Sequence, residues 1–296
     1  MKQKILLCGI CALLLFACKK DKKAPDVKLY PISFNVSGFS QTGVPIDGKA
    51  KTNSLNTQAT DTVPVQSLYY MLYNNIGDLI TTRRVNKGDA NFGQFNDNVP
   101  AGSYRAVFCG GSSSLTAYQT KYFTYSTNPI SNNTPCYWDD TFFYSLSFIV
   151  ANTGINESIE MHRETARLVL VITDAIPTGT SKIVVKYQDT ASIGYDGVHR
   201  YAAINTTSKT INATDIGTTN YTIVTNTLND TKPFDVTVEY YGTNPVGPLG
   251  TKVIKNVVCK SNYITTLTGN LFSPGGNGQF ALSIDTDWGT PVTVNF

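Results

Sequence analysis

The stretch that decides the fold class runs from Leu68 to Ile80 and reads Leu-Tyr-Tyr-Met-Leu-Tyr-Asn-Asn-Ile-Gly-Asp-Leu-Ile. Over residues 68–73, alternate side chains fall on opposite faces of one extended strand, and both faces carry large apolar or aromatic groups. Residues 74–78, Asn-Asn-Ile-Gly-Asp, have the composition of a tight turn, after which the apolar pattern resumes at Leu79. The segment therefore predicts a β-hairpin with a buried first strand.

Short runs of the same kind recur outward from this hairpin, separated by turn clusters such as Val99-Pro100-Ala101-Gly102-Ser103. Residues 40–63, rich in Thr, Asn and Gly, predict a long loop. The most polar gap, residues 151–160, separates two groups of runs, so we expect an all-β chain of two tandem β-sandwich domains over residues 28–157 and 158–296. The expected strands are 32–36, 68–73, 79–80, 104–108, 121–125, 142–150, 167–172, 182–187, 235–241, 253–259, 263–271, 280–284 and 292–296.

The composition agrees with this fold class. The chain has 38 Thr and 25 Asn but 4 Glu against 17 Asp, which favours strands and turns over helices. From Ala24 onward, 18 basic and 20 acidic residues give a net charge of −2, without clustered Arg. Such a near-neutral surface excludes nucleic acid as an expected partner.

The N-terminus predicts a lipoprotein signal peptide over residues 1–17. Two Lys residues precede an apolar run of 12 residues, Ile5 to Phe16, which is too short to span a bilayer. The run ends in Leu15-Phe16-Ala17-Cys18, which resembles a bacterial lipobox, with a plain secretory peptide as the alternative. Lipidation at Cys18 would make residues 18–27 a charged tether and place the protein at the outer membrane, anchored by lipid.

Catalytic and metal-binding patterns are not found. The two histidines, His162 and His199, have no Glu or Cys at ligand spacing, and they are interpreted as surface or interface residues. Residues 43–49 imitate a phosphate loop, but Ala50 replaces the Ser or Thr that binds magnesium. No Gly-x-Ser-x-Gly nucleophile motif occurs. We expect no enzyme activity, no metal and no cofactor.

Two groups of acidic residues lie beside the two tryptophans. An aromatic face next to carboxylates can stack on a sugar ring and hydrogen-bond its hydroxyls, although Asp at turns and Trp in the core is the favoured interpretation. The candidate glycan contacts are Trp138, Asp139, Asp140, Asp285, Asp287 and Trp288.

Three cysteines follow the lipidation site. Cys109 and Cys136 lie in one expected domain and could form a disulfide, with Cys259 left as a buried thiol. Three buried thiols are the other possibility.

In the order and spacing of its motifs, the chain resembles the fimbrillin superfamily of Bacteroidota, in particular the FimB/Mfa-type fimbrial anchor subunits. The tether also resembles the export tags of Bacteroidota surface lipoproteins. The resemblance implies two transthyretin-like (Greek-key) sandwiches, a cell-surface lipoprotein, cell adhesion through a fimbria (pilus), and other fimbrial subunits as partners. It rests on Cys18, the 68–80 hairpin, 100–104, 166–168, 262–263, 269–271 and 284–296.

The resemblance also implies donor-strand complementation, in which one subunit supplies a strand to its neighbour. Val292, Val294 and Phe296 alternate suitably for a donor strand. Polymerising fimbrillins are cut after an early Arg, but here the first Arg is Arg83, and a cut there would remove residues 32–72 and destroy the core. The chain is therefore expected to stay uncut as an anchor or accessory subunit. The alternative function is a stand-alone surface lipoprotein that binds host or bacterial glycans.

Overall fold

The computed structural model describes residues 27–40, 65–111, 115–118, 121–124, 135–136, 138–230, 232–244, 246–273 and 281–285. These residues are nearly all β, with a single 3-10 turn at Ala213–Asp215 as their helical element. Within the same ranges, no helix is long and apolar enough to cross a membrane. The expected all-β sandwich fold is confirmed.

The first sandwich is a seven-stranded sheet of order β3-β2-β5-β9-β10-β1-β4, folded over its own core. Within the described residues, β9 and β10 pair at two positions, Phe142 with Arg163 and Phe143 with His162, so the two halves of the sheet can face one another. Phe34 from one half contacts Tyr70 and Phe108 from the other, at ring-centroid distances of 5.8 and 5.4 Å. The strands are β1 Leu29–Ser40, β2 Ser67–Asn74, β3 Leu79–Asn86, β4 Gln94–Pro100, β5 Gly102–Gly111, β9 Thr141–Val150 and β10 Ile155–Arg163.

The second sandwich packs a four-stranded sheet, β14-β11-β17-β18, against a seven-stranded sheet that contains β16-β15-β12-β13-β8 together with β6 and β7. Leu168 and Leu170 of β11 share a buried cluster with Val185 of β12 and Val236 of β15. The strands are β6 Thr116–Tyr118, β7 Tyr122–Thr124, β8 Pro135–Cys136, β11 Ala166–Ile172, β12 Thr180–Gly194, β13 His199–Thr210, β14 Tyr221–Thr227, β15 Phe234–Gly242, β16 Gly250–Val257, β17 Ile264–Gly269 and β18 Ala281–Asp285.

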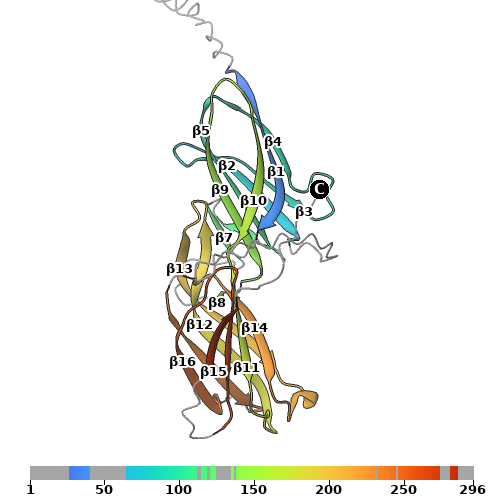
Figure 1. Cartoon of the computed structure of the whole chain (residues 1–296), viewed down its shortest axis with the longest axis vertical. Coiled ribbons are helices and arrows are strands. Elements are labelled where there is room, and N and C mark those ends of the chain that lie inside the picture. Colours follow the sequence, from blue (N-terminus) through green and yellow to red (C-terminus); the bar gives the residue numbers. More distant parts are fainter. Residues whose placement is uncertain are drawn as a thin grey trace, which may run out of the picture.

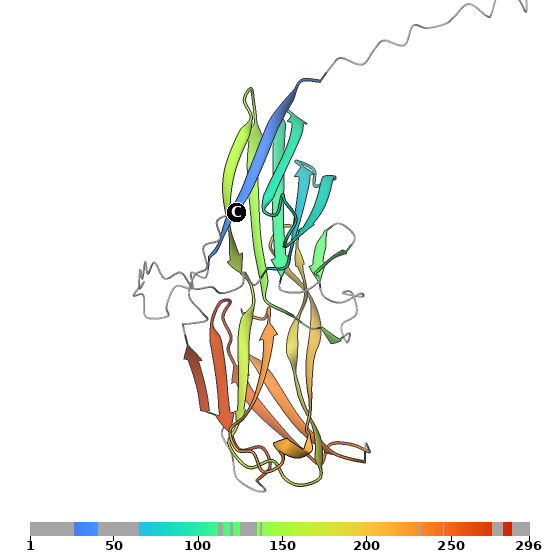
Figure 2. The ribbon, with the colours of Figure 1, turned by 90° about the vertical axis from the view of Figure 1, so that its right-hand side faces the viewer.

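The two sandwiches follow one another along the long axis of the molecule (Figures 1 and 2). The chain passes from one to the other at Glu164 and Thr165, between β10 and β11. Residues 151–160, expected as the gap between domains, instead include the start of β10, which pairs in parallel with β1. Ile159 and Met161 of β10 are buried in the first core, so this polar-looking segment carries its apolar face inward.

A third buried cluster lies between the two sandwiches, and we call it the junction core. The long β12–β13 hairpin reaches the first sandwich, where β7 pairs with β12 through Phe123 and Ile193 (Figure 1). Short strands that precede β9 in the sequence thereby join the sheet of the second sandwich. The members of the junction core include Met71, Cys109, Phe123, Trp138, Ile193 and Leu228.

Candidate functional site

Trp138, a candidate glycan contact, lies in the junction core. The side chain is 1% exposed, and its Nε1 donates a hydrogen bond of 2.5 Å to the carbonyl oxygen of Thr190 in β12. The Trp138 carbonyl accepts a bond of 3.3 Å from Asn226 at the end of β14. The indole face is therefore covered by protein and does not present a platform for a sugar ring, in agreement with the core interpretation.

Asp140, beside Trp138, forms a buried ion pair with Arg163. The contact is bidentate, with Nε–Oδ1 at 2.7 Å and Nη2–Oδ2 at 3.0 Å, and the side chains of Arg163 and Asp140 are 4% and 11% exposed. Arg163 also donates to Asn262 Oδ1 at 2.9 Å. The pair thus ties the start of β9 and the end of β10 to the turn before β17 in the second sandwich. Asp139 accepts a bond from the Asp140 backbone nitrogen at 2.9 Å.

The other site residues predicted from the sequence lie at the edge of the described chain or beyond it. Asp285 is the last residue of β18, and its backbone pairs with Ile264. The residues outside the described ranges are Cys18, Asp287, Trp288, Val292, Val294 and Phe296.

The suggested bridge between Cys109 and Cys136 stays a prediction, because the side chain of Cys136 lies outside the described part of the structure. Cys109 is a free, buried thiol in the junction core, and Cys259 is a free, buried thiol in the second core. Burial raises the pKa of both thiols, because a thiolate would lose its hydration there. Low reactivity follows from this protonated state.

Asp189 in β12 holds a buried polar network that the sequence analysis did not identify. Its carboxylate accepts five hydrogen bonds, from the backbone nitrogens of Thr190, Leu228 and Asn229 and from the side chains of Thr227 and Asn205. Burial raises the pKa of Asp189 to about 6, although these donors favour the charged form. The sequence gives little signal for this network, because β12 also contains Lys, Gln, Thr and Ser. This network joins β12, β13 and the end of β14.

His199, at the start of β13, lies where the chain crosses between the sandwiches. Its Nε2 is 3.4 Å from Glu164 Oε2 and its Nδ1 is 3.9 Å from Asp230 Oδ1, an oxygen that is buried and accepts no hydrogen bond among the described residues. Burial alone would lower the pKa of His199. The bond to Glu164 and the negative charges of Asp230, Glu164 and Asp189 outweigh burial, so the net effect is a raised pKa. The other histidine, His162, is exposed. Across the described ranges, no three His, Cys, Asp or Glu side chains are placed to hold a metal ion.

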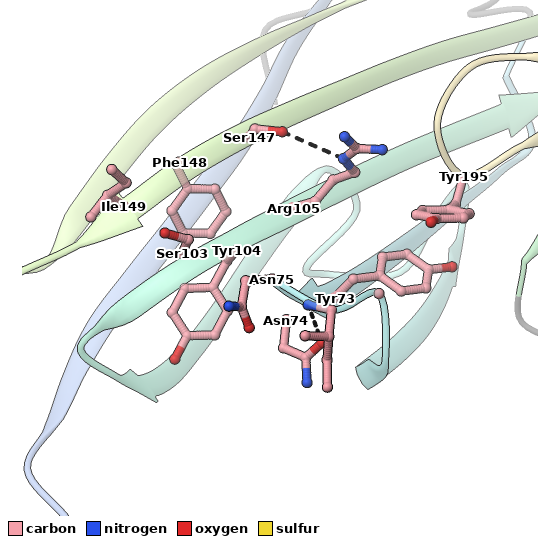
Figure 3. A pocket seen from close by; sticks show the side chains of 12 residues that line it. Tyr73, Asn74, Asn75, Ser103, Tyr104, Arg105, Ser147, Phe148, Ile149 and Tyr195 are labelled. Carbon is pink, nitrogen blue, oxygen red and sulfur yellow. Dashed lines mark hydrogen bonds between the residues drawn. The ribbon is translucent and has the colours of Figure 1, made fainter.

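An open pocket of about 520 Å³ lies on the outer face of the first sandwich, beside the tip of the β12–β13 hairpin (Figure 3). The Tyr195 ring at that tip packs against the Tyr73 ring of β2, with ring centroids 4.8 Å apart and ring planes tilted by 36°. The Arg105 guanidinium lies over the Tyr195 ring at 5.5 Å, and its Nε donates to Ser147 Oγ at 3.4 Å. The β2–β3 turn, which includes Asn75, completes the wall.

The turn in that wall was predicted from the sequence, and its geometry follows from its residues. Asn74 Oδ1 accepts hydrogen bonds from the backbone nitrogens of Ile76 and Asp78, at 3.1 and 2.8 Å. Gly77 adopts φ +84°, a conformation that favours glycine. The pocket itself was not predicted, because its walls come from segments far apart in the sequence.

Comparison with known proteins identifies the fold. No family model and no curated protein matches the sequence. Among solved structures, the fimbrial anchor protein Mfa2 from Porphyromonas gingivalis matches with a TM-score of 0.51 and 12% identity, covering 90% of this chain and 100% of that one. A Bacteroides thetaiotaomicron protein described provisionally as polysaccharide-binding has a TM-score of 0.51 and 8% identity, covering 90% of this chain and 98% of that one.

A third structure, from Bacteroides ovatus and described provisionally as an adhesin, has a TM-score of 0.49 and 11% identity, covering 88% of this chain and 98% of that one. The solved structures similar to this chain thus include a fimbrial anchor protein of Bacteroidota, at low sequence identity. The chain has the all-β sandwich fold of the fimbrial anchor protein Mfa2.

Proposed function

We propose that this protein is a surface lipoprotein that serves as the anchor or an accessory subunit of a fimbria. The shared fold with a fimbrial anchor over 90% of the chain supports this function, as does the lipobox sequence at Cys18. Leu29, the first residue of β1, follows Cys18 by 11 residues. Even a fully extended tether would keep β1 within about 40 Å of a lipid on Cys18.

The observation that carries the proposal is the position of β1 inside the first sandwich. β1 pairs with β10 on one side and with β4 on the other, and Ile32, Phe34 and Val36 are at most 1% exposed. Loss of this strand would expose the core on which both halves of the sheet pack. A subunit that keeps its first strand fits the end of a fimbria, where the lipid must stay attached to the folded protein.

The C-terminal segment supplies the proposed contact with the neighbouring subunit. β18 pairs with β17 and is one edge of the four-stranded sheet in the described part of the chain. Val292, Val294 and Phe296 follow it with the alternation of a strand. We assign this segment as the donor strand, which would gain main-chain hydrogen bonds and side-chain pockets in the neighbour.

Co-purification of fimbrial subunits with variants of the full chain tests the proposal. Phe296→Asp should abolish recovery of a neighbouring fimbrillin, because a charge cannot enter an apolar side-chain pocket without a partner. Val246→Asp is the matched control, since Val246 is 89% exposed in the turn between β15 and β16. Equal recovery of the neighbour with both variants would contradict donor-strand joining. Cys18→Ala should release the protein from the membrane fraction, and membrane retention of this variant would contradict lipid anchoring.

A further inference from the structure

Arg105 is the one charged residue in the wall of the pocket, and it has no carboxylate partner among the described residues. Arg83, Arg163 and Arg200 each pair with an aspartate. Arg105 instead contacts the Tyr195 ring and the Ser147 hydroxyl, which leaves donors of the guanidinium for an acceptor from outside. A carboxylate binds a guanidinium strongly, through two parallel hydrogen bonds.

The remaining walls carry the Tyr195 ring and neutral polar groups. The Tyr195 ring packs against Tyr73, with ring planes tilted by 36°. The rings of Tyr104 and Phe148 face the core of the first sandwich, so these two residues form the floor of the pocket without offering it a ring face. Ser103, Ser147 and Asn75 line the same pocket with exposed hydroxyl and amide groups (Figure 3). A ring face with short neutral hydrogen-bonding groups suits a ligand that has apolar faces and many hydroxyls, as a sugar ring does.

The pocket favours a compact ligand over an extended peptide. At residues 103–105, β5 pairs with β9 on one side, and at Tyr104 and Arg105 it pairs with β2 on the other. The main-chain groups of β5 in the pocket are thus engaged in the sheet, so this strand offers a ligand its side chains and not an open edge. A volume of about 520 Å³ lies in the range of small-molecule sites.

From these contacts we propose that the pocket binds an acidic saccharide, with its carboxylate on Arg105 and a sugar ring beside Tyr195. Residues of both sandwiches build the site, because Tyr195 comes from the β12–β13 hairpin and the other walls from the first sandwich. The proposed fimbrial role does not require this activity and does not depend on it. Binding would add recognition of acidic glycans to the subunit itself.

Calorimetric titration of the full chain, purified in detergent, tests the inference. The probes are a galacturonic acid trimer, a hyaluronan tetrasaccharide and 3′-sialyllactose, each compared with its carboxyl-reduced form. At least one acidic probe should bind, with affinity at least tenfold above its reduced form, and Arg105→Gln should lower that affinity about tenfold or more. Arg84→Gln is the matched control, because Arg84 lies over the Tyr69 ring at 5.5 Å but outside the pocket.

A second variant tests the pocket without disturbing the fold. Ile149, on the pocket rim, is 71% exposed, so Ile149→Glu should preserve the thermal midpoint while its carboxylate competes for Arg105 and lowers saccharide affinity. Absence of binding for all three probes at 10 mM, or binding unchanged in both pocket variants, would overturn the proposal. So would an acidic peptide that binds more tightly than any of the saccharides and depends equally on Arg105. None of these outcomes bears on fimbrial assembly.

Discussion

Asp140 and Arg163 show why charged residues beside a tryptophan in sequence are not by themselves a binding site. Both side chains are nearly buried and contact each other through two hydrogen bonds, and Arg163 donates a further bond to Asn262 in the second sandwich. Removing one partner would leave the other charge without compensation in the protein interior. Asp139, Asp140 and Trp138 could be noticed from the sequence, but Arg163 and Asn262, which determine their role, are distant along the chain.

The first prediction concerns this ion pair. Asp140→Ala should lower the free energy of unfolding by about 3–5 kcal/mol, because Arg163 stays buried without its carboxylate. Urea denaturation monitored by tryptophan fluorescence measures the change. Asp235→Ala, which removes the exposed partner of Lys255, is the control and should leave the midpoint unchanged. Equal effects of the two variants would contradict a stabilising role for the buried Asp140–Arg163 ion pair.

The second prediction concerns pH. The raised pKa of His199 means that the folded protein holds this proton more tightly than the unfolded chain does. The stability that it contributes is fully present below pH about 6.5 and is lost as the pH rises through the folded pKa. The free energy of unfolding should therefore fall with pH above about 6.5, and His199→Gln should weaken this dependence.

Asp189 changes stability in a separate, lower pH range. Burial raises the pKa of Asp189 to about 6 in the folded protein. The stability that the bound proton contributes is therefore lost between about pH 4 and 6 as the pH rises. Urea unfolding at intervals from pH 4 to 9 distinguishes the two groups. A pH profile above 6.5 that is identical in the wild type and in His199→Gln would contradict the assignment to His199.

At the scale of elements, the sequence predicted strands best where alternation was strong. The β2–β3 hairpin and its Asn74–Asp78 turn are confirmed. The strands that were not predicted include β4, β10, β13 and β14, because polar or charged residues occupy many of their positions. In β13, Asn205 is fully buried and donates to Asp189 and to the Asn226 carbonyl. A buried polar side chain is tolerated in a strand when residues of other strands form hydrogen bonds with it. The local sequence pattern does not show which residues those are.

The third prediction follows from the contacts that hold Arg83 within strand β3. Arg83 pairs through its backbone with Tyr70 and through its side chain with Asp97 of β4, so the peptide bond after it is held in a strand. An arginine-specific protease should leave the native protein uncut at Arg83 and Arg84 and should cut there after heat denaturation. Mass spectrometry of timed digests measures this. Rapid native cleavage at Arg83, with β1 released, would contradict an anchor that keeps its first strand.

At the scale of the whole molecule, the junction core couples the two sandwiches. Ile193 of β12 is fully buried in it and pairs with Phe123, whose strand precedes β9 in the chain. Neither a hydrophobic run nor a polar gap in the sequence revealed this cluster, since its members come from both expected domains. The expected division into two domains stays a prediction, and we propose that the transition lies at Glu164 and Thr165.

The fourth prediction is that both sandwiches unfold together. Differential scanning calorimetry should show one transition, because separating the sandwiches would expose the junction core to water. Ile193→Ala should lower the stability of the whole protein by about 2–5 kcal/mol, through loss of burial and formation of a cavity. Val224→Ala, at a site that is 51% exposed in β14, should change it by about 0.5 kcal/mol or less. Two separate transitions, with only one shifted by Ile193→Ala, would contradict the coupling.

The anchor function requires that the protein keeps its lipid and its first strand and is joined to a neighbouring subunit. An unheated gel of native outer-membrane extract, with mass spectrometry on each band that contains this protein, reports its partners and its processing together. We expect a heat-sensitive band above the monomer that contains another fimbrillin, with this chain acylated at Cys18 and uncut at Arg83. An acylated monomer without any partner, or a chain shortened at Arg83, would contradict the anchor function.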